Sequence, residues 1–186
     1  MMKEMNNSHF KEYAMPSIIL VLICVVVTFA LVTTFMVTEP IIKIAAEREA
    51  EEARKKVLPE STGFELLISS EMNEAKLTDN ALEVYKTNNN VGYAVLTQDK
   101  GYGGTIKVIT GIGEDGTIKN VILLEQKETP GLGTRAGEAA FVGQFTGKET
   151  VEVIDTISGA TISSNAMIRA VGSALQQMEA IKKGGI

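Results

Sequence analysis

One stretch near the start of the chain limits its possible folds more than any other feature. From Tyr13 to Thr38 no side chain is charged, and between Ile18 and Val37 only three threonines are not apolar. About twenty helical residues span roughly 30 Å, which is the thickness of the hydrocarbon core of a bilayer. A threonine hydroxyl can bond to a carbonyl of its own helix, so the threonines do not exclude a span. The pattern predicts a transmembrane helix over residues 18–38.

A cleaved signal peptide is the main alternative to a permanent span. The apolar region of such a peptide is usually about 7–15 residues long and ends in small residues. Here the run is longer and ends in Phe35, Met36 and Val37. Lipoprotein processing at Cys24 would require a small residue just before the cysteine, where Ile23 stands. We therefore interpret Cys24 as a lipid-facing or packing residue.

The orientation of the span follows less directly from the charges around it. Lys3 and Lys11 precede it in a tail of residues 1–17, and Lys43 and Arg48 follow it. The positive-inside rule counts these basic residues, whereas long domains translocate largely regardless of charge. We expect the short tail in the cytoplasm and the large domain on the extracytoplasmic side of a prokaryotic inner membrane.

Composition excludes two classes of function. The chain has 18 Lys and Arg against 23 Asp and Glu, a net charge of −5, which argues against a nucleic-acid partner. A single cysteine and a single histidine permit neither an internal disulfide nor an ordinary zinc site. None of the 17 glycines precedes Gly63, so the chain has two compositionally different parts.

Residues 39–58 follow the span and mix apolar with charged residues without glycine. Glu51 and Lys55 stand at the i,i+4 spacing that supports a helix. This pattern predicts a helical stalk, which we interpret as a solvated spacer rather than a coupling rod. Residues 59–186 then form the globular domain.

The periodicity of that domain is typical of an α+β fold. Between Ala81 and Gln126, four segments rich in β-branched residues are separated by turn formers (NNN, DKGYGG and EDG), which predicts an antiparallel meander. We expect a helix over 137–145, a strand over 150–155 (TVEVID), and a long amphipathic helix over 163–183. The last has one apolar stripe, formed by Ile168, Val171, Leu175, Met178 and Ile181.

Two glycine patterns resemble nucleotide sites only superficially. Gly111, Gly113 and Gly116 have the GxGxxG spacing, but a strand pattern follows them where a dinucleotide site needs a helix, so a hairpin is expected. The segment 143–148, GQFTGK, has the wrong glycine spacing for a phosphate loop, and Glu149 follows where Ser or Thr is needed.

Two further motifs allow either a ligand or a simple structural role. In ETPGLG (128–133), two glycines after Pro130 permit close approach to a flat or anionic group, or only a tight turn. The segment 155–166, DTISGATISSNA, leads to the start of the last helix, with the capping types Ser163, Ser164 and Asn165. A helix start of this kind favours a phosphate, although plain N-capping would use the same residues.

The residues of these motifs carry a resemblance. DTISGAT (155–161) resembles the flavinylation motif of the FMN-binding domain family, and ETPGLG and GYGG (101–104) resemble its two other signatures. With one N-terminal span, the whole chain is similar to the family of G subunits of Rnf ion-translocating electron-transport complexes.

The resemblance implies a covalent cofactor. Thr161 would carry FMN through a phosphoester bond. A separate flavin transferase would make this bond, using FAD as the donor and releasing AMP. That enzyme would recognise Asp155 and the residues that follow it. The positions implied to bind or line the flavin, besides Thr161, are Ser158, Gly159, Ala160, Ser163, Ser164, Glu128, Thr129, Pro130, Gly131, Leu132, Gly133, Gly101, Tyr102, Gly103 and Gly104. Tyr102 would stack on the flavin ring or shield it. Arg135 would either provide a cation for the phosphate or for the reduced flavin, or have only a surface role.

The function implied is an electron relay without catalytic residues of its own. The chain would work with other membrane and peripheral subunits that couple ferredoxin and NAD electron transfer to sodium or proton translocation. Three alternatives remain at this point. They are the C subunit of a sodium-pumping NADH:quinone reductase, a stand-alone flavoprotein, and a non-redox membrane-anchored binding or scaffold domain.

Overall fold

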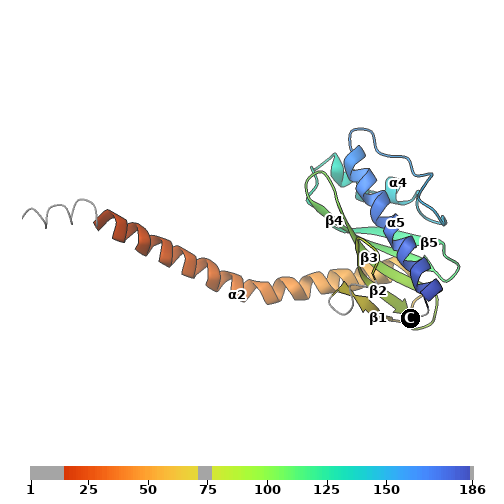
Figure 1. Ribbon diagram of the computed structural model, residues 1–186, viewed down its shortest axis with the longest axis horizontal. Helices are drawn as coiled ribbons and strands as arrows, with labels where there is room; N and C mark the ends of the chain where they lie inside the picture. The colour runs from red at the N-terminus through yellow and green to blue at the C-terminus, as the bar shows by residue number, and fades with distance from the viewer. Residues whose placement is uncertain (1–14, 71–76, 185–186) are drawn as a thin grey trace, which may run out of the picture. The chain divides into compact units, whose positions relative to one another are not determined.

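The computed structural model describes residues 15–70 and 77–184 of the chain, which forms two compact units, Met1–Glu47 and Arg48–Ile186 (Figure 1). Most of the expected tail, residues 1–14, lies outside the described residues. The helix α2 (Met15–Val57) accounts for the described part of the first unit and continues into the second. The α+β fold class is confirmed by this helix, a five-stranded antiparallel sheet and a long C-terminal helix.

The apolar stretch is helical from Met15 onward, where the described residues begin. Among the described residues, α2 is the one helix long and apolar enough to cross a membrane, with a mean hydropathy of 3.0 over a window in which no residue is buried. The threonine hydroxyls bond back as expected: Thr34 Oγ1 donates to Ala30 O at 2.9 Å and Thr38 Oγ1 to Thr34 O at 2.9 Å. Pro40 lies inside the helix without ending it.

The sheet confirms the expected meander and adds one strand. Its order is β1-β2-β3-β4-β5, with every neighbouring pair antiparallel. The strands are β1 (Phe64–Ser69), β2 (Ala81–Thr87), β3 (Gly92–Lys100), β4 (Thr105–Gly113) and β5 (Ile118–Glu125). The additional strand is β1, which no sequence pattern predicts: its residues FELLIS lack a clean alternation, and its pairing with β2 shifts register between Leu66 and Ile68.

The helix α5 (Thr161–Gly184) covers one face of the sheet and confirms the predicted C-terminal helix (Figure 1). Toward its C-terminal end, the buried side chain of Met178 belongs to a cluster with Val84 and Val95 of the strands. Nearer its start, Met167 belongs to a second cluster with Val108 of β4. The helix start is therefore held in place by a packed body, and a rigid support of this kind is what a ligand site needs.

The opposite sheet face is covered by the last turns of α2, within the second unit. Ala53, Val57 and Leu58 form a core cluster with Ala94 and Ile109 of the central strands. The backbone approach is close, since a Cβ on Gly111 would lie 2.5 Å from the Val57 carbonyl oxygen. The end of α2 therefore packs within the second compact unit, Arg48–Ile186.

The expected stalk pairing is present, and one of its basic side chains has an unexpected role. Lys55 Nζ and Glu51 Oε1 form the i,i+4 ion pair at 2.6 Å. Arg54 is buried, and its guanidinium carbon lies 4.1 Å from the centroid of the Tyr85 ring. A cation over an aromatic face at this distance is attracted by the ring quadrupole.

Two predictions between β5 and α5 need correction. Residues 137–145 contain only the four-residue helix α4 (Ala139–Val142), preceded by the 3₁₀ helix η3 (Gly133–Gly137) and followed by turns. The strand predicted over 150–155 is wrong, because side chains and not a neighbouring strand satisfy this backbone. Gln144 Oε1 accepts from Asp155 N at 3.0 Å, and Lys148 Nζ donates to Val153 O at 3.3 Å.

The hairpin predicted for the GxGxxG pattern is confirmed. β4 ends at Gly113 and β5 begins at Ile118, with Gly116 N donating to Gly113 O at 2.9 Å. Gly116 has φ of +89°, a conformation that L side chains rarely adopt. The third glycine is therefore required by the turn and not by a nucleotide.

Candidate functional site

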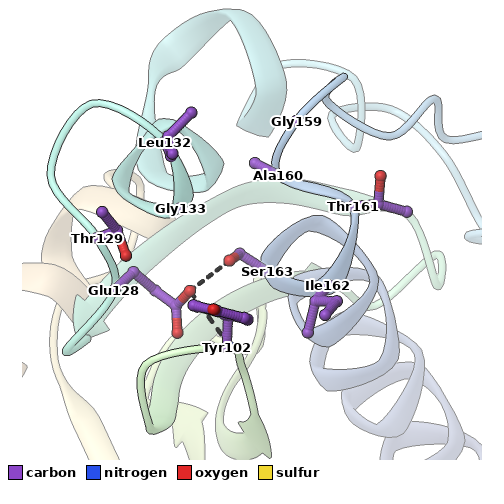
Figure 2. Close-up of a pocket in the computed structure, with 10 residues that line it drawn as sticks. All are labelled: Tyr102, Glu128, Thr129, Leu132, Gly133, Gly159, Ala160, Thr161, Ile162 and Ser163. Carbon is purple, nitrogen blue, oxygen red and sulfur yellow. Dashed lines mark hydrogen bonds between the residues drawn. The ribbon is translucent and has the colours of Figure 1, made fainter.

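Three glycine-containing segments, from distant parts of the sequence, meet at the N-terminal end of α5 (Figure 2). They are the GYGG loop between β3 and β4, the ETPGLG segment after β5, and the SGAT turn before α5. Together they enclose a pocket of about 590 Å³, within the 300–1,000 Å³ typical of cofactor sites. Its lining residues are Tyr102, Glu128, Thr129, Leu132, Gly133, Gly159, Ala160, Thr161, Ile162 and Ser163.

The SGAT segment forms a tight turn that presents Thr161. Ala160 N donates to Ile157 O at 2.9 Å, which closes a four-residue turn. Gly159 stands at its third position with φ of +82°, where a type II turn requires a positive φ. Thr161 is then the first residue of α5 and is exposed to solvent. Gly159 thus allows the turn to form, and Thr161 presents its hydroxyl to solvent at the start of the helix.

The helix begins two residues before the position we predicted, so Ser163 and Ser164 lie inside its first turn and do not cap it. Ser164 is fully buried; its hydroxyl donates to Ala160 O at 2.9 Å and accepts from Ile157 N at 3.1 Å. It supports the turn from beneath and is not among the residues that line the pocket.

Glu128 links the ETPGLG segment to the GYGG loop and to the start of α5. Its side chain is buried at 6% exposure, and its Oε1 accepts from Gly103 N at 3.0 Å. Its Oε2 accepts from Tyr102 N at 3.3 Å and from the Ser163 hydroxyl. Figure 2 shows this carboxylate between Tyr102 and Ser163. One side chain of the ETPGLG segment therefore fixes both the GYGG loop and the start of α5.

The glycines around this carboxylate are needed for space. A Cβ on Gly101 would overlap Glu128 Oε1, and one on Gly103 would overlap the Lys127 carbonyl. A Cβ on Gly133 would lie 2.5 Å from Glu128 Oε2 and 2.7 Å from Ser163 Oγ. These positions are confined to glycine by contacts among the motifs themselves.

The rim of the pocket is apolar and open. Tyr102, Leu132 and Ile162 are 73%, 49% and 54% exposed, although each has a large hydrophobic side chain. At the start of α5, the Ser164 amide donates to Ala160 O at 2.9 Å, and the amides of the residues just before it have no acceptor within the helix, as at any helix start. The pocket thus combines an apolar surface suited to a flat ring with backbone donors suited to an anion.

Comparison with known proteins agrees with this geometry. The family model of the FMN-binding domain matches residues 101–176, a stretch that contains all three segments. The G subunit of the ion-translocating oxidoreductase complex of Methanosarcina acetivorans is 31% identical over 93% of this chain and 98% of its own length. The chain belongs to this family of G subunits.

Other relatives in the family support the same assignment. The G subunit of the Na(+)-translocating ferredoxin:NAD(+) oxidoreductase complex of Acetobacterium woodii is 34% identical over 90% of this chain and 85% of its own length. The G subunit of the ion-translocating oxidoreductase complex of Vibrio vulnificus is 29% identical, with 80% and 83% covered. With its apolar helix, this member of the family is a membrane-anchored protein whose domain is of the FMN-binding type.

Several expected site residues lie in the same segments but not on the pocket wall. These are Gly101, Gly103, Gly104, Pro130, Gly131, Ser158 and Ser164. Asp155 lines a separate depression of about 150 Å³ with Arg135, Glu138 and Gln144. Arg135 therefore does not reach the larger pocket as a lining residue, and Asp155 is presented on a different part of the surface.

Sequence reasoning missed two contributors to the site. Ile162 lines the pocket next to Thr161; it lies within the segment 155–166, but it was not among the residues expected to bind the flavin. Arg169 on α5 forms a bidentate pair with Asp99 at the end of β3, at 2.9 and 3.0 Å, and also donates to Lys100 O at 3.3 Å. This pair connects α5 to β3, the strand that leads into the GYGG loop. The hydrogen bond to Asp99 also raises the pKa of Arg169. Nothing in the sequence links residues seventy positions apart.

Proposed function

We propose that this protein carries FMN in the pocket, joined through its phosphate to Thr161, and relays electrons within a membrane complex. The complex would couple electron transfer between ferredoxin and NAD to the movement of sodium ions or protons. The observation that carries the proposal is the exposed Thr161 hydroxyl, which stands at the first residue of α5 inside an apolar-rimmed pocket.

The residues of the pocket fit the parts of FMN. Tyr102, Leu132 and Ile162 offer apolar surface to the isoalloxazine ring, and the start of a helix at Thr161 favours an anion such as a phosphate on that residue. A phosphodiester keeps one negative charge, which a helix start stabilises by roughly 0.3–1 kcal/mol when exposed and up to about 2 when partly buried. That energy alone is too small to retain a flavin permanently, and a covalent bond removes the problem.

The chain's own residues hold the cofactor and do not transform a substrate. FMN, when bound, accepts two electrons and passes them on singly. Of the described residues that line the pocket, Glu128 alone is charged, and its acceptor sites are taken by three donors. We therefore assign no catalytic residue to this chain.

Attachment would require a separate flavin transferase with FAD as donor. The Thr161 oxygen would form a bond to the FMN phosphorus, the pyrophosphate bond would break, AMP would leave, and the hydroxyl proton would pass to a base of the transferase. Asp155 and Thr156 are exposed outside the pocket, where an enzyme that reads the segment from its surface would reach them.

The remaining parts of the proposal concern topology and the coupled ion. We propose residues 1–17 as a cytoplasmic tail, 18–38 as the span, 39–58 as the connecting helix, and the domain that follows on the extracytoplasmic side. The relative from Acetobacterium woodii is named as sodium-translocating and one from Clostridium ljungdahlii as proton-translocating, so family membership is compatible with either ion. A periplasmic-type reporter fused after Ile186 should be active, and a cytoplasmic reporter there should be inactive.

The decisive experiment is coexpression with a flavin transferase, followed by a denaturing gel viewed for flavin fluorescence. The wild-type band should fluoresce and Thr161→Ala should not. Thr105→Ala is the control, because it removes an exposed threonine hydroxyl that does not line the pocket. Its band should fluoresce like the wild type. A dark wild-type band would remove the basis for an electron relay.

A further inference from the structure

The buried carboxylate of Glu128 is an unusual group to find beside a redox cofactor. Its side chain is only 6% exposed, yet it lines the pocket that we propose for FMN. The ETPGLG signature accounts for its place in the sequence but not for its charge.

The hydrogen bonds at Glu128 require acceptors on both oxygens. Backbone amides can only donate, and the two that reach this side chain approach different atoms: Gly103 N bonds to Oε1 and Tyr102 N to Oε2. A protonated acid would turn one oxygen into a donor and a poor acceptor. The contacts therefore fit the ionised carboxylate.

The charge is not cancelled by a cation. All three donors are uncharged groups, namely two amides and the Ser163 hydroxyl. Within the residues that the structure describes, none of the ion pairs involves Glu128. A buried charge with neutral partners keeps a long-range field, because the surrounding dielectric screens it weakly.

We propose that Glu128 lowers the reduction potential of the flavin held in this pocket. The inference rests on the proposed function. Each electron that enters the ring adds negative charge until a proton follows, and a nearby fixed negative charge opposes that change. Charge placed beside a flavin is one of the means by which a protein adjusts its electronics. The uncharged donors hold the carboxylate in position and weaken its field only in part.

The test uses the full-length, flavinylated protein in detergent and a spectroscopic redox titration. Glu128→Gln removes the charge and keeps the shape. We expect at least a tenfold shift of the reduction equilibrium toward reduced flavin, about 30 mV for a two-electron couple. Glu138→Gln is the control, since it removes an exposed carboxylate that lines the neighbouring depression and not this pocket. Its potential should equal that of the wild type.

A second variant separates charge from position. Ser163→Ala removes a donor and leaves the carboxylate, so the field at the flavin should strengthen and the potential should fall. A purely structural role would instead move both variants in the same direction. The proposal is overturned if Glu128→Gln has the wild-type potential, or if Ser163→Ala is unchanged or higher. Where Glu128→Gln does not fold, Ser163→Ala decides alone by the same criterion.

The two proposals fail in different ways. Wild-type protein without flavin would remove the proposed function, and no titration would then be possible. Wild-type protein that carries flavin, with an unshifted potential in Glu128→Gln, would contradict only the role of the charge.

Discussion

The Ser164 hydroxyl accepts a hydrogen bond from the backbone amide of Ile157, seven residues earlier, at 3.1 Å. The same hydroxyl donates to Ala160 O at 2.9 Å. One side chain thus closes the turn that precedes Thr161 from its buried side. The shape of the attachment site depends on a serine that the flavin does not need to touch.

Ser164→Ala should weaken this turn without removing the attachment residue. The Ile157 amide loses its partner in a partly buried position, so we expect a loss of about 1–3 kcal/mol in the free energy of unfolding. With limiting transferase, flavin attachment should slow but still reach completion. Ser173→Ala, another buried serine of α5, is the control and should label at the wild-type rate. Equal labelling rates for both variants would contradict the supporting role.

Gly159→Ala tests the backbone conformation of the motif. Its φ of +82° is strained for alanine, at a cost of roughly 1–2 kcal/mol. The nearest atom to an added Cβ is Leu132 Cδ2 at 3.9 Å, so crowding adds nothing. Gly147→Ala is a matched control, with φ of +78° and open space around its Cβ. Both variants should lose similar stability in denaturant titrations, but only Gly159→Ala should lose flavin labelling.

The last turns of α2 should be part of the folded domain. Val57 is fully buried against the sheet, and Ala53 is 4% exposed. We expect Val57→Ala to lower the free energy of unfolding by about 2 kcal/mol, from lost burial and the cavity left behind. A soluble fragment that begins at Arg48 should likewise melt at a higher temperature than one that begins at Pro59. Equal melting temperatures would show that the helix end contributes no packing energy.

One surface ion pair gives a pH-dependent prediction. The Lys107 ammonium, 2.7 Å from Glu125, holds the pKa of that carboxyl below its usual value, first through its hydrogen bond and then through its charge. A pKa that is lower in the folded state adds stability above the unfolded-state value, and this stability disappears as the pH falls through the folded-state pKa. Because both side chains are more than one third exposed, the contribution should stay below about 1 kcal/mol.

The measurement is a denaturant titration of the wild type and Glu125→Gln across pH. The variant should be slightly less stable at pH 7, and the difference should vanish in acid below the usual glutamate range. A difference that persisted unchanged in acid would mean that the ion pair is not its source.

The sequence predicted those features that depend on local patterns. The span, the meander and α5 follow from uncharged length, from turn formers between β-branched runs and from one apolar stripe. The pattern of 150–155 also alternates, yet the segment is a loop, because Gln144 and Lys148 bond its backbone. Local alternation cannot reveal a partner that lies elsewhere.

The site was predictable only through resemblance to a family. From residue spacing alone, ETPGLG could have been only a tight turn, and the segment that contains SGAT could have served only to cap a helix. The Glu128 carboxylate bonds Gly103 and Ser163, 25 and 35 positions away, and so joins ETPGLG to the GYGG loop and to the first turn of α5. Contacts at such separations depend on the sheet and on α5, and no periodicity encodes them. The same limit applies to Asp99 and Arg169.

The central claim is that Thr161 carries the flavin. Its most direct test is mass spectrometry of the protein purified from the membranes of its native host. We predict that the peptide containing Thr161 has gained the mass of one FMN less one water, with fragmentation placing the addition on that threonine. A Thr161 peptide found without modification in the mature complex would contradict the claim.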